Sequence, residues 1–181
     1  VINKYFGGWK KSDKVTRPEF APQPEITAAK DTTVVGQDAE NLTMAWRFKG
    51  ANQGEGDILD VISSILSNGK AGLFDTDLTQ TMKVQGVNAG TDEQHDYTAF
   101  IAIGMPNQGQ KLEEVRALIL EEMGKLRRGE FADDLIPAVI ANKKLDFYKL
   151  LDGNDQRATM MGNAFINDQD WAQVANQLER Q

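Results

Sequence analysis

Histidine and cysteine, the side chains that most often bind transition metals or act as nucleophiles, are almost absent from this chain. His95 is the only histidine among 181 residues, and there is no cysteine. Metal sites that need two imidazoles, such as H-E-x-x-H and H-x-x-E-H, cannot be completed within these residues. The lack of cysteine also excludes thiolate zinc sites, iron–sulfur clusters, disulfides and cysteine nucleophiles. We therefore predict no catalytic residue, no metal ligand set and no cofactor in this chain, and we interpret His95 as a surface imidazole.

Carboxylates are the other residues whose spacing suggests chemistry. Asp75 and Asp77 form a D-x-D pattern, but a Mg²⁺ or Ca²⁺ site needs several oxygens that converge from different segments. The adjacent glutamates at 113–114 and 121–122 suggest paired acid and base groups, although such pairs on an amphipathic helix usually form its solvated face. A carboxylate-based hydrolase remains a third hypothesis, and substitution of Asp75 and Asp77 tests it.

The charge distribution argues against anionic partners. The net charge is −7, and residues 31–109 carry four basic and eleven acidic side chains. Binding to nucleic acid or to an anionic membrane needs a basic stripe, which this chain lacks. The glycines of Gly54-Glu55-Gly56 resemble part of a dinucleotide loop, but Glu55 and Asp57 put negative charge where a pyrophosphate would bind. No apolar run approaches the roughly 20 residues that span a bilayer.

Alternating and periodic hydrophobic patterns predict the elements that position these residues. Strands are expected at four places: 32–35, 42–48, 83–89 and 97–104. The polar stretches at 36–41 and 90–96 are expected to join them in antiparallel pairs. Helices are expected between and after these pairs of strands, at residues 58–66, 72–80, 112–126, 135–150, 160–165 and 171–178. Asn167-Asp168 is expected to cap the last of them. Paired strands and runs of helices predict an α+β fold with an antiparallel sheet. Met160, Met161 and Trp171 are expected in the core.

The beginning of the chain has the character of a connection. Residues 1–6 are typical of the last turn of a helix that Gly7-Gly8 ends, and no initiator Met precedes them. Pro18, Pro22 and Pro24 predict an extended, Pro-rich arm over residues 10–30. We expect residues 1–181 to be a single domain cut from a longer multidomain chain.

Three strings, taken in their order and spacing, resemble those of a known family. They are KYFGGW at residues 4–9, ILSNGKAGLF at residues 65–74 and FINDQDW at residues 165–171. The first is similar to a helix end before a Pro-rich arm, and the second to a stretch written L-x-x-G-x-x-S-R-L-F. The third is similar to a C-terminal string of long bacterial members. The chain thus resembles, over nearly its whole length, the non-catalytic second-type domain of insulinase/pitrilysin zinc metallopeptidases, which include mitochondrial processing peptidase.

This resemblance implies a fold and a set of partners. The fold is an α+β domain with helices packed on one face of a mostly antiparallel sheet, and two to four such domains enclose a peptide. Zinc is bound by H-x-x-E-H in a different, catalytic domain, whose glutamate is the general base. With one histidine, this chain cannot be that domain. The implied partners are the catalytic domain of the same peptidase and peptide substrates.

The resemblance also marks positions that would face the enclosed chamber. Catalytically cooperating domains of the family place an Arg and, seven residues on, a Tyr near the substrate. The matching positions here are Thr79 and Gly86, and the Arg of S-R-L-F falls on Gly72. Neither Thr nor Gly can supply a guanidinium or phenol contact. The hypothesis is an inactive structural or substrate-enclosing domain of a zinc-dependent endopeptidase.

Alternatives stay open at this point. A stand-alone module could use its acidic central region to hold cationic peptides or to assemble with a partner, and its binding would weaken steeply with salt. The parent protein is expected to be a metalloendopeptidase, whereas this chain by itself is not expected to be catalytic. A domain cut from a clamshell exposes an apolar patch, so homodimerisation is a further expectation. The compartment depends on sequence upstream, and the resemblance alone suggests the bacterial periplasm.

Overall fold

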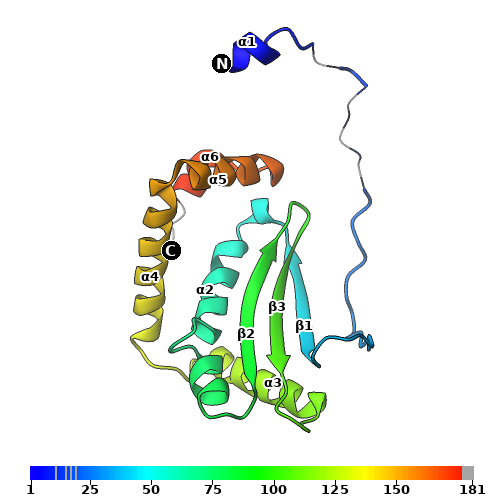
Figure 1. The fold of residues 1–181 in the computed structure, drawn as a ribbon, viewed down its shortest axis with the longest axis vertical. Coiled ribbons are helices and arrows are strands. Elements are labelled where there is room, and N and C mark those ends of the chain that lie inside the picture. The colour runs from blue at the N-terminus through cyan, green and yellow to red at the C-terminus, as the bar shows by residue number, and fades with distance from the viewer. Residues whose placement is uncertain (11, 15, 17, 19, 177–181) are drawn as a thin grey trace. The chain divides into compact units, whose positions relative to one another are not determined.

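The computed structural model describes residues 1–10, 12–14, 16, 18 and 20–176 (Figure 1). The chain divides into two compact units, Val1–Val34 and Val35–Gln181. In the first unit, helix α1 (Ile2–Phe6) ends at Gly7, whose N–H donates to the carbonyl of Asn3. The expected helix end before Gly7-Gly8 is therefore confirmed. The described part of residues 10–30 contains neither helix nor strand.

A three-stranded antiparallel sheet forms the centre of the second unit. Its strands are β1 (Leu42–Lys49), β2 (Gly86–Glu93) and β3 (Tyr97–Met105). The strand order is β1-β3-β2, so β3 pairs with both neighbours. Phe100 of β3 lies opposite Trp46 on one side and Thr91 on the other. The prediction of an α+β fold with an antiparallel sheet is confirmed.

Two details of the strand prediction were wrong. Residues 32–35 belong to no strand, and both Val34 and Val35 are exposed to solvent. β-branched residues favour strands where their side chains pack on a pleated, half-buried surface. The side chains of Val34 and Val35 do not pack on such a surface. Strand β2 starts at Gly86 rather than at residue 83 and continues to Glu93 through the expected turn at 90–96. Main-chain pairing with β3 holds these polar residues in the ladder despite their low strand propensity.

Helices follow the expected order, with small shifts of their bounds. They are η1 (Ala51–Gln53, 3₁₀), α2 (Gly56–Leu66), η2 (Asp75–Thr79, π-helical), α3 (Leu112–Arg128), α4 (Leu135–Asp152), α5 (Asn154–Ile166) and α6 (Trp171–Ala175). The cap of α6 is Asp170, which accepts a hydrogen bond from the Ala172 N–H at 2.8 Å. The expected cap at Asn167-Asp168 was therefore wrong, because Asp168 has a φ of 55° and belongs to the preceding turn. Leu178, expected in this helix, lies outside the described residues.

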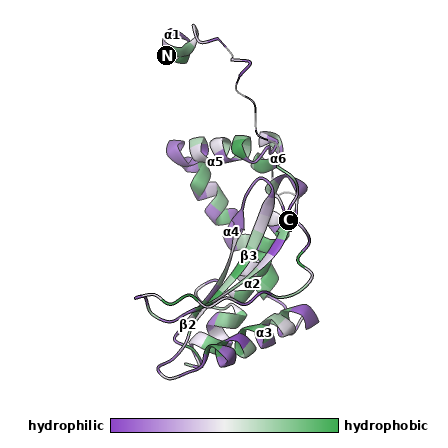
Figure 2. Ribbon diagram, turned by 90° about the vertical axis from the view of Figure 1, so that its right-hand side faces the viewer, coloured by the Kyte–Doolittle hydropathy of each residue, from purple (hydrophilic) through white to green (hydrophobic). Residues whose placement is uncertain are grey.

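The main core lies between one face of the sheet and helices α2 and α3, which lie on the same side of the strands in both ribbon views (Figures 1 and 2). Every second residue of β3 is buried against these helices. Gly104 of β3 allows the closest approach, since a Cβ there would lie 2.5 Å from Val115 Cγ1 and 3.0 Å from Ile119 Cδ1 of α3. The core joins these helices to η2 and the sheet, and it contains Leu59, Leu66, Leu73, Phe74, Leu78, Val84, Val87, Phe100, Ala102, Val115 and Ile119.

The later helices are less deeply packed. Helix α4 packs on α2, where Leu135 and Val139 form a second cluster with Ile65. The expectation that Met161 of α5 is a core residue was wrong, since it is 49% exposed, whereas Met160 and Trp171 are half-buried. Phe165 of the same helix is also exposed. None of the helices in the described part of the chain combines the length and the hydrophobicity that a membrane crossing requires.

The position of α3 gives a matched pair of substitutions. We expect Ile119→Ala to lower the free energy of unfolding by about 2–5 kcal/mol, because it leaves a cavity at a side chain with no exposed surface. Leu120 is the next residue on the same helix and is 45% exposed, so Leu120→Ala should cost much less. Urea unfolding of the two variants measures the difference, and equal losses would contradict the assigned orientation of α3.

Candidate functional site

The two positions expected from the family resemblance lie on consecutive elements. Thr79 is the last residue of η2, and its hydroxyl oxygen is buried without a hydrogen-bond partner among the described residues. Gly86 is the first residue of β2 and lies opposite Met105 of β3. Elements η2 and β2 pack together, so the sheet and α3 hold both positions in place. That these positions face a chamber remains a prediction.

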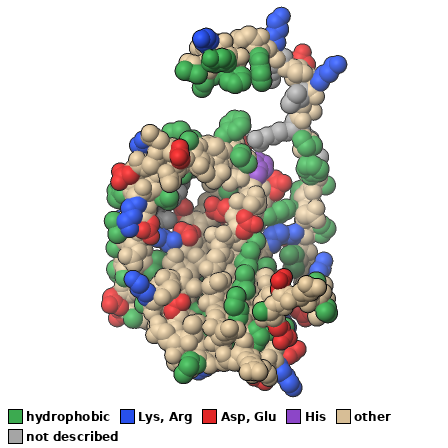
Figure 3. All heavy atoms as spheres, viewed as in Figure 1, with side chains coloured by type: hydrophobic (Ala, Val, Ile, Leu, Met, Phe, Trp, Pro, Cys, Tyr) green, Lys and Arg blue, Asp and Glu red, His purple; other side chains and the backbone are tan. Residues whose placement is uncertain are grey.

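Gly86 belongs to the face of the sheet that α2 and α3 do not cover. Because successive residues of a strand point to opposite faces, this open face is made by the odd-numbered residues of β1 and β3 and the even-numbered residues of β2. Ile101 and Ile103 are half-buried there, whereas Ala45 and Asn88 are exposed. In Figure 3, which is viewed from this side, the middle of the surface is mostly backbone and uncharged side chains beside a band of hydrophobic ones.

The middle of the open face offers contacts with backbone and apolar groups, whereas its charged residues, Arg47, Lys49 and Asp92, lie toward one end. A Cβ added at Gly90 would meet no atom within 4 Å, so main chain is directly accessible there. At one end of the face, the Arg47 guanidinium lies over the Tyr97 ring, 4.8 Å from its centroid. Glycine in a strand often marks a place where another backbone approaches closely. The face is therefore suited to an extended polypeptide more than to a small polar ligand.

The loop before η2 explains why the expected arginine position is a glycine. A Cβ at Gly72 would lie 2.5 Å from the carbonyl oxygen of Leu66, which is a backbone atom with little freedom to move. The buried carboxylate of Asp75 holds the same loop, since it accepts hydrogen bonds from the N–H groups of Asn68 at 2.8 Å and Gly72 at 3.2 Å. No side chain fits at position 72 without a shift of the loop.

The two aspartates of the D-x-D pattern thus have separate structural roles. Asp75 binds backbone N–H groups, whereas Asp77 forms an ion pair with Lys125 Nζ of α3 at 2.6 Å. This ion pair, a hydrogen bond from the Thr76 hydroxyl and the charge of Lys125 together hold the pKa of Asp77 below its ordinary value, against the opposing effect of burial. Within the described residues, no group of three or more His, Cys, Asp or Glu side chains is arranged to hold a metal ion.

The expectation that both glutamate pairs form a solvated face was wrong for one residue. Glu113, Glu114 and Glu121 are exposed, but Glu122 is only 1% exposed. Its Oε1 accepts from Lys125 Nζ at 2.9 Å, and its Oε2 is buried with no hydrogen-bond partner among the described residues. Burial raises the pKa of Glu122, although Lys125 opposes this shift. The sequence did contain a signal, because Glu122 continues the buried stripe of Val115 and Ile119 at helical spacing.

The remaining charged residues are compensated or exposed. His95 lies half-buried in the β2–β3 turn, with Nδ1 2.6 Å from Asp96 Oδ1. Asp60 of α2 pairs with Lys143 of α4 at 2.5 Å, as Asp77 pairs with Lys125. The acidic excess of the central sequence is therefore partly neutralised by lysines from later helices.

Comparison with known proteins agrees with the fold. Residues 1–143 match the family model described as the Peptidase M16 inactive domain, so this chain belongs to that family. The "Zinc protease PqqE" of Helicobacter pylori is 22% identical over 173 residues, which cover 93% of this chain and 39% of that protein. A solved structure titled "The crystal structure of a protease from Helicobacter pylori" matches with a TM-score of 0.72 and 18% identity, over 77% of this chain and 34% of that one. The chain thus spans well under half the length of these relatives.

The tight contact at Gly72 can be tested with a second glycine as a control. We expect Gly72→Ala to lower the free energy of unfolding by about 1–3 kcal/mol, because the new methyl group forces the loop away from Leu66. Gly90→Ala adds the same methyl group on the open face, where no atom lies within 4 Å, and should change stability by less than about 0.5 kcal/mol. Denaturant unfolding of both variants measures the contrast. Similar stabilities would show that the loop adapts.

Proposed function

We propose that this domain is the non-catalytic, substrate-enclosing half of a zinc-dependent endopeptidase. Zinc would be held by a separate catalytic domain of the same peptidase, and this chain would contribute the open face of its sheet as one wall of the peptide chamber. The observation that carries the proposal is the match of residues 1–143 to the inactive domain of a peptidase family. The open face supplies the surface that such a role requires.

The donor set of the chain argues against a zinc site of its own. His95 is the only imidazole in the sequence, and its Nδ1 contacts Asp96 in an exposed turn. Three protein ligands are usual at a catalytic zinc, and most of them are imidazoles or carboxylates that converge on one point. No step of peptide hydrolysis is therefore assigned to residues of this chain. Its role would be to bind and to orient the peptide.

The alternative of a stand-alone module with an acidic binding region has less support. Such a module needs acidic side chains that are available to a cationic peptide. Asp60 and Asp77 are paired with lysines of α4 and α3, whereas Asp38, Glu40, Asp92 and Glu93 are exposed. The family match also accounts for most of the chain without requiring an acidic binding site.

The proposed wall can be blocked without touching the zinc. Ala45→Arg places a long charged side chain on the open face, where the alanine is exposed. When the variant chain is combined with the catalytic domain of the same peptidase, we expect kcat/KM for a quenched fluorescent peptide to fall about tenfold or more, mainly through KM. The zinc content of the catalytic domain should not change.

A matched control uses the same substitution on the opposite side of the unit. Ala117 is exposed on α3, away from the open face, so Ala117→Arg should leave cleavage and association unchanged. Urea unfolding of each chain alone checks that both variants are folded. Failure of the wild-type chain to associate with the catalytic domain, or equal activity of Ala45→Arg and wild type, would refute the proposed function.

A further inference from the structure

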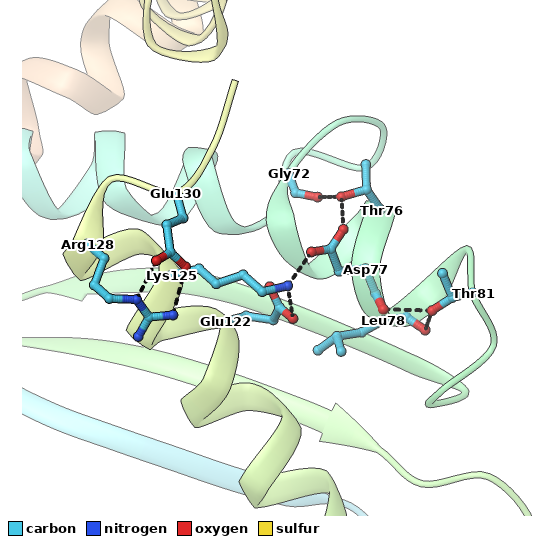
Figure 4. A network of polar contacts seen from close by, with 9 residues as sticks. All are labelled: Gly72, Thr76, Asp77, Leu78, Thr81, Glu122, Lys125, Arg128 and Glu130. Carbon is cyan, nitrogen blue, oxygen red and sulfur yellow. Dashed lines mark hydrogen bonds and ion pairs between the residues drawn. The ribbon is translucent and has the colours of Figure 1, made fainter. Parts of the chain in front are cut away.

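The ion pair between η2 and α3 contains one carboxyl group more than its lysine can neutralise. Lys125 Nζ lies 2.6 Å from Asp77 Oδ2 and 2.9 Å from Glu122 Oε1, so two carboxylates share one ammonium group (Figure 4). Asp77 and Lys125 keep about a third and a quarter of their side-chain surfaces exposed, whereas Glu122 keeps 1%. When both carboxyl groups are ionised, the cluster of Asp77, Glu122 and Lys125 has a net charge of −1. Glu122 is the most deeply buried of the three and bears the excess negative charge.

The second oxygen of Glu122 makes this excess costly. Glu122 Oε2 is buried without a hydrogen-bond partner among the described residues. A buried, unpaired charge is disfavoured much more than a buried neutral group. Protonation of Glu122 removes the excess charge and leaves a neutral Lys125–Asp77 ion pair. Uptake of one proton therefore strengthens the contact between α3 and η2.

We propose that Glu122, Lys125 and Asp77 form a pH-dependent latch that fastens η2 to α3, closing on mild acidification and loosening as Glu122 ionises. The latch holds η2 (Asp75–Thr79) and the turn that follows it as far as Lys83, before the chain joins the sheet through the Gln85 N–H. Loosening it changes the order of this segment while the sheet and α2 stay folded. The proposal concerns this chain alone and does not depend on the proposed peptidase role.

The surroundings of Glu122 set the direction of the effect. Lys125 on its own helix and Asp77 on η2 are the titratable groups that act on its pKa in the described structure, and α2, β1 and β3, which also pack on α3, add none. Burial raises the pKa of Glu122, so its contribution is complete below the unfolded value and is lost as pH rises through the folded value. The pKa of Asp77 is lowered, so its contribution is lost only at strongly acidic pH. The latch is therefore tightest in a mildly acidic window.

Amide hydrogen exchange measured between pH 4 and pH 8 tests the latch. The reporters are the N–H groups of Gln80 and Lys83, which donate to the carbonyls of Asp75 and Leu78, and the reference is the Gln85 N–H, which donates to Met105 of the sheet. After correction for intrinsic exchange, protection of the two reporters should fall as pH rises, while the reference stays constant. The fall is up to about tenfold for each pH unit by which the folded pKa of Glu122 exceeds the unfolded one.

Three variants separate the latch from a general loss of stability. Glu122→Gln is nearly isosteric and permanently neutral, so its reporters should stay protected at every pH in the range. Glu121→Gln removes the adjacent exposed carboxyl group and should behave like the wild type. Lys125→Met should lower reporter protection throughout. A wild-type profile as flat as that of Glu122→Gln, or a parallel change at Gln85, would overturn the proposal.

Discussion

The close packing of α3 on β3 is the constraint on which the rest of the second unit depends. Gly104 lacks a Cβ, and one added there would lie 2.5 Å from Val115 and 3.0 Å from Ile119. The helix therefore packs directly on main chain, which fixes its distance from the sheet more strictly than flexible side chains could. Once α3 is fixed, its later turns carry Glu122 and Lys125 to η2. The core and the charged cluster are thus consequences of one contact.

The pairing of charged side chains follows from this packing rather than from the order of residues in the chain. The acidic excess lies in residues 31–109, yet its members meet cations that come much later: Lys125 is 48 residues from Asp77, and Lys143 is 83 residues from Asp60. Helices α3 and α4 bring these lysines back to η2 and α2. The pairing leaves Glu122 as a buried carboxyl group without a full partner. Such a group costs stability, and its helix is held in place by the buried apolar contacts of Val115 and Ile119.

The two faces of the sheet differ in what covers them, and this difference underlies the proposed role as a wall of a peptide chamber. One face is fully used by α2 and α3 to build the core. The other face has small or uncharged residues such as Ala45 and Asn88 in its middle, whereas Arg47, Lys49 and Asp92 lie toward one end of it. Gly72 and Gly86 stand where the family resemblance leads one to expect an arginine and a tyrosine, and at Gly72 the nearby Leu66 carbonyl leaves no space for a side chain. The glycine at position 72 is thus a requirement of the loop's own packing.

Local patterns in the sequence determined the class of the fold and most of its elements. Period-two and helical spacing are properties of neighbouring residues, so strands 42–48 and 97–104 and the helix at 112–126 could be read directly. Tertiary structure alone decided that residues 32–35 pair with no strand, that β2 extends to Glu93 and that Phe165 stays exposed. It also decided the partner of each charge, because Asp77 and Lys125 are brought together by packing between distant segments. Glu122 combines both kinds of information. Its helical spacing in the sequence indicated burial, but only the packing of α3 against η2 showed that it shares Lys125 with Asp77.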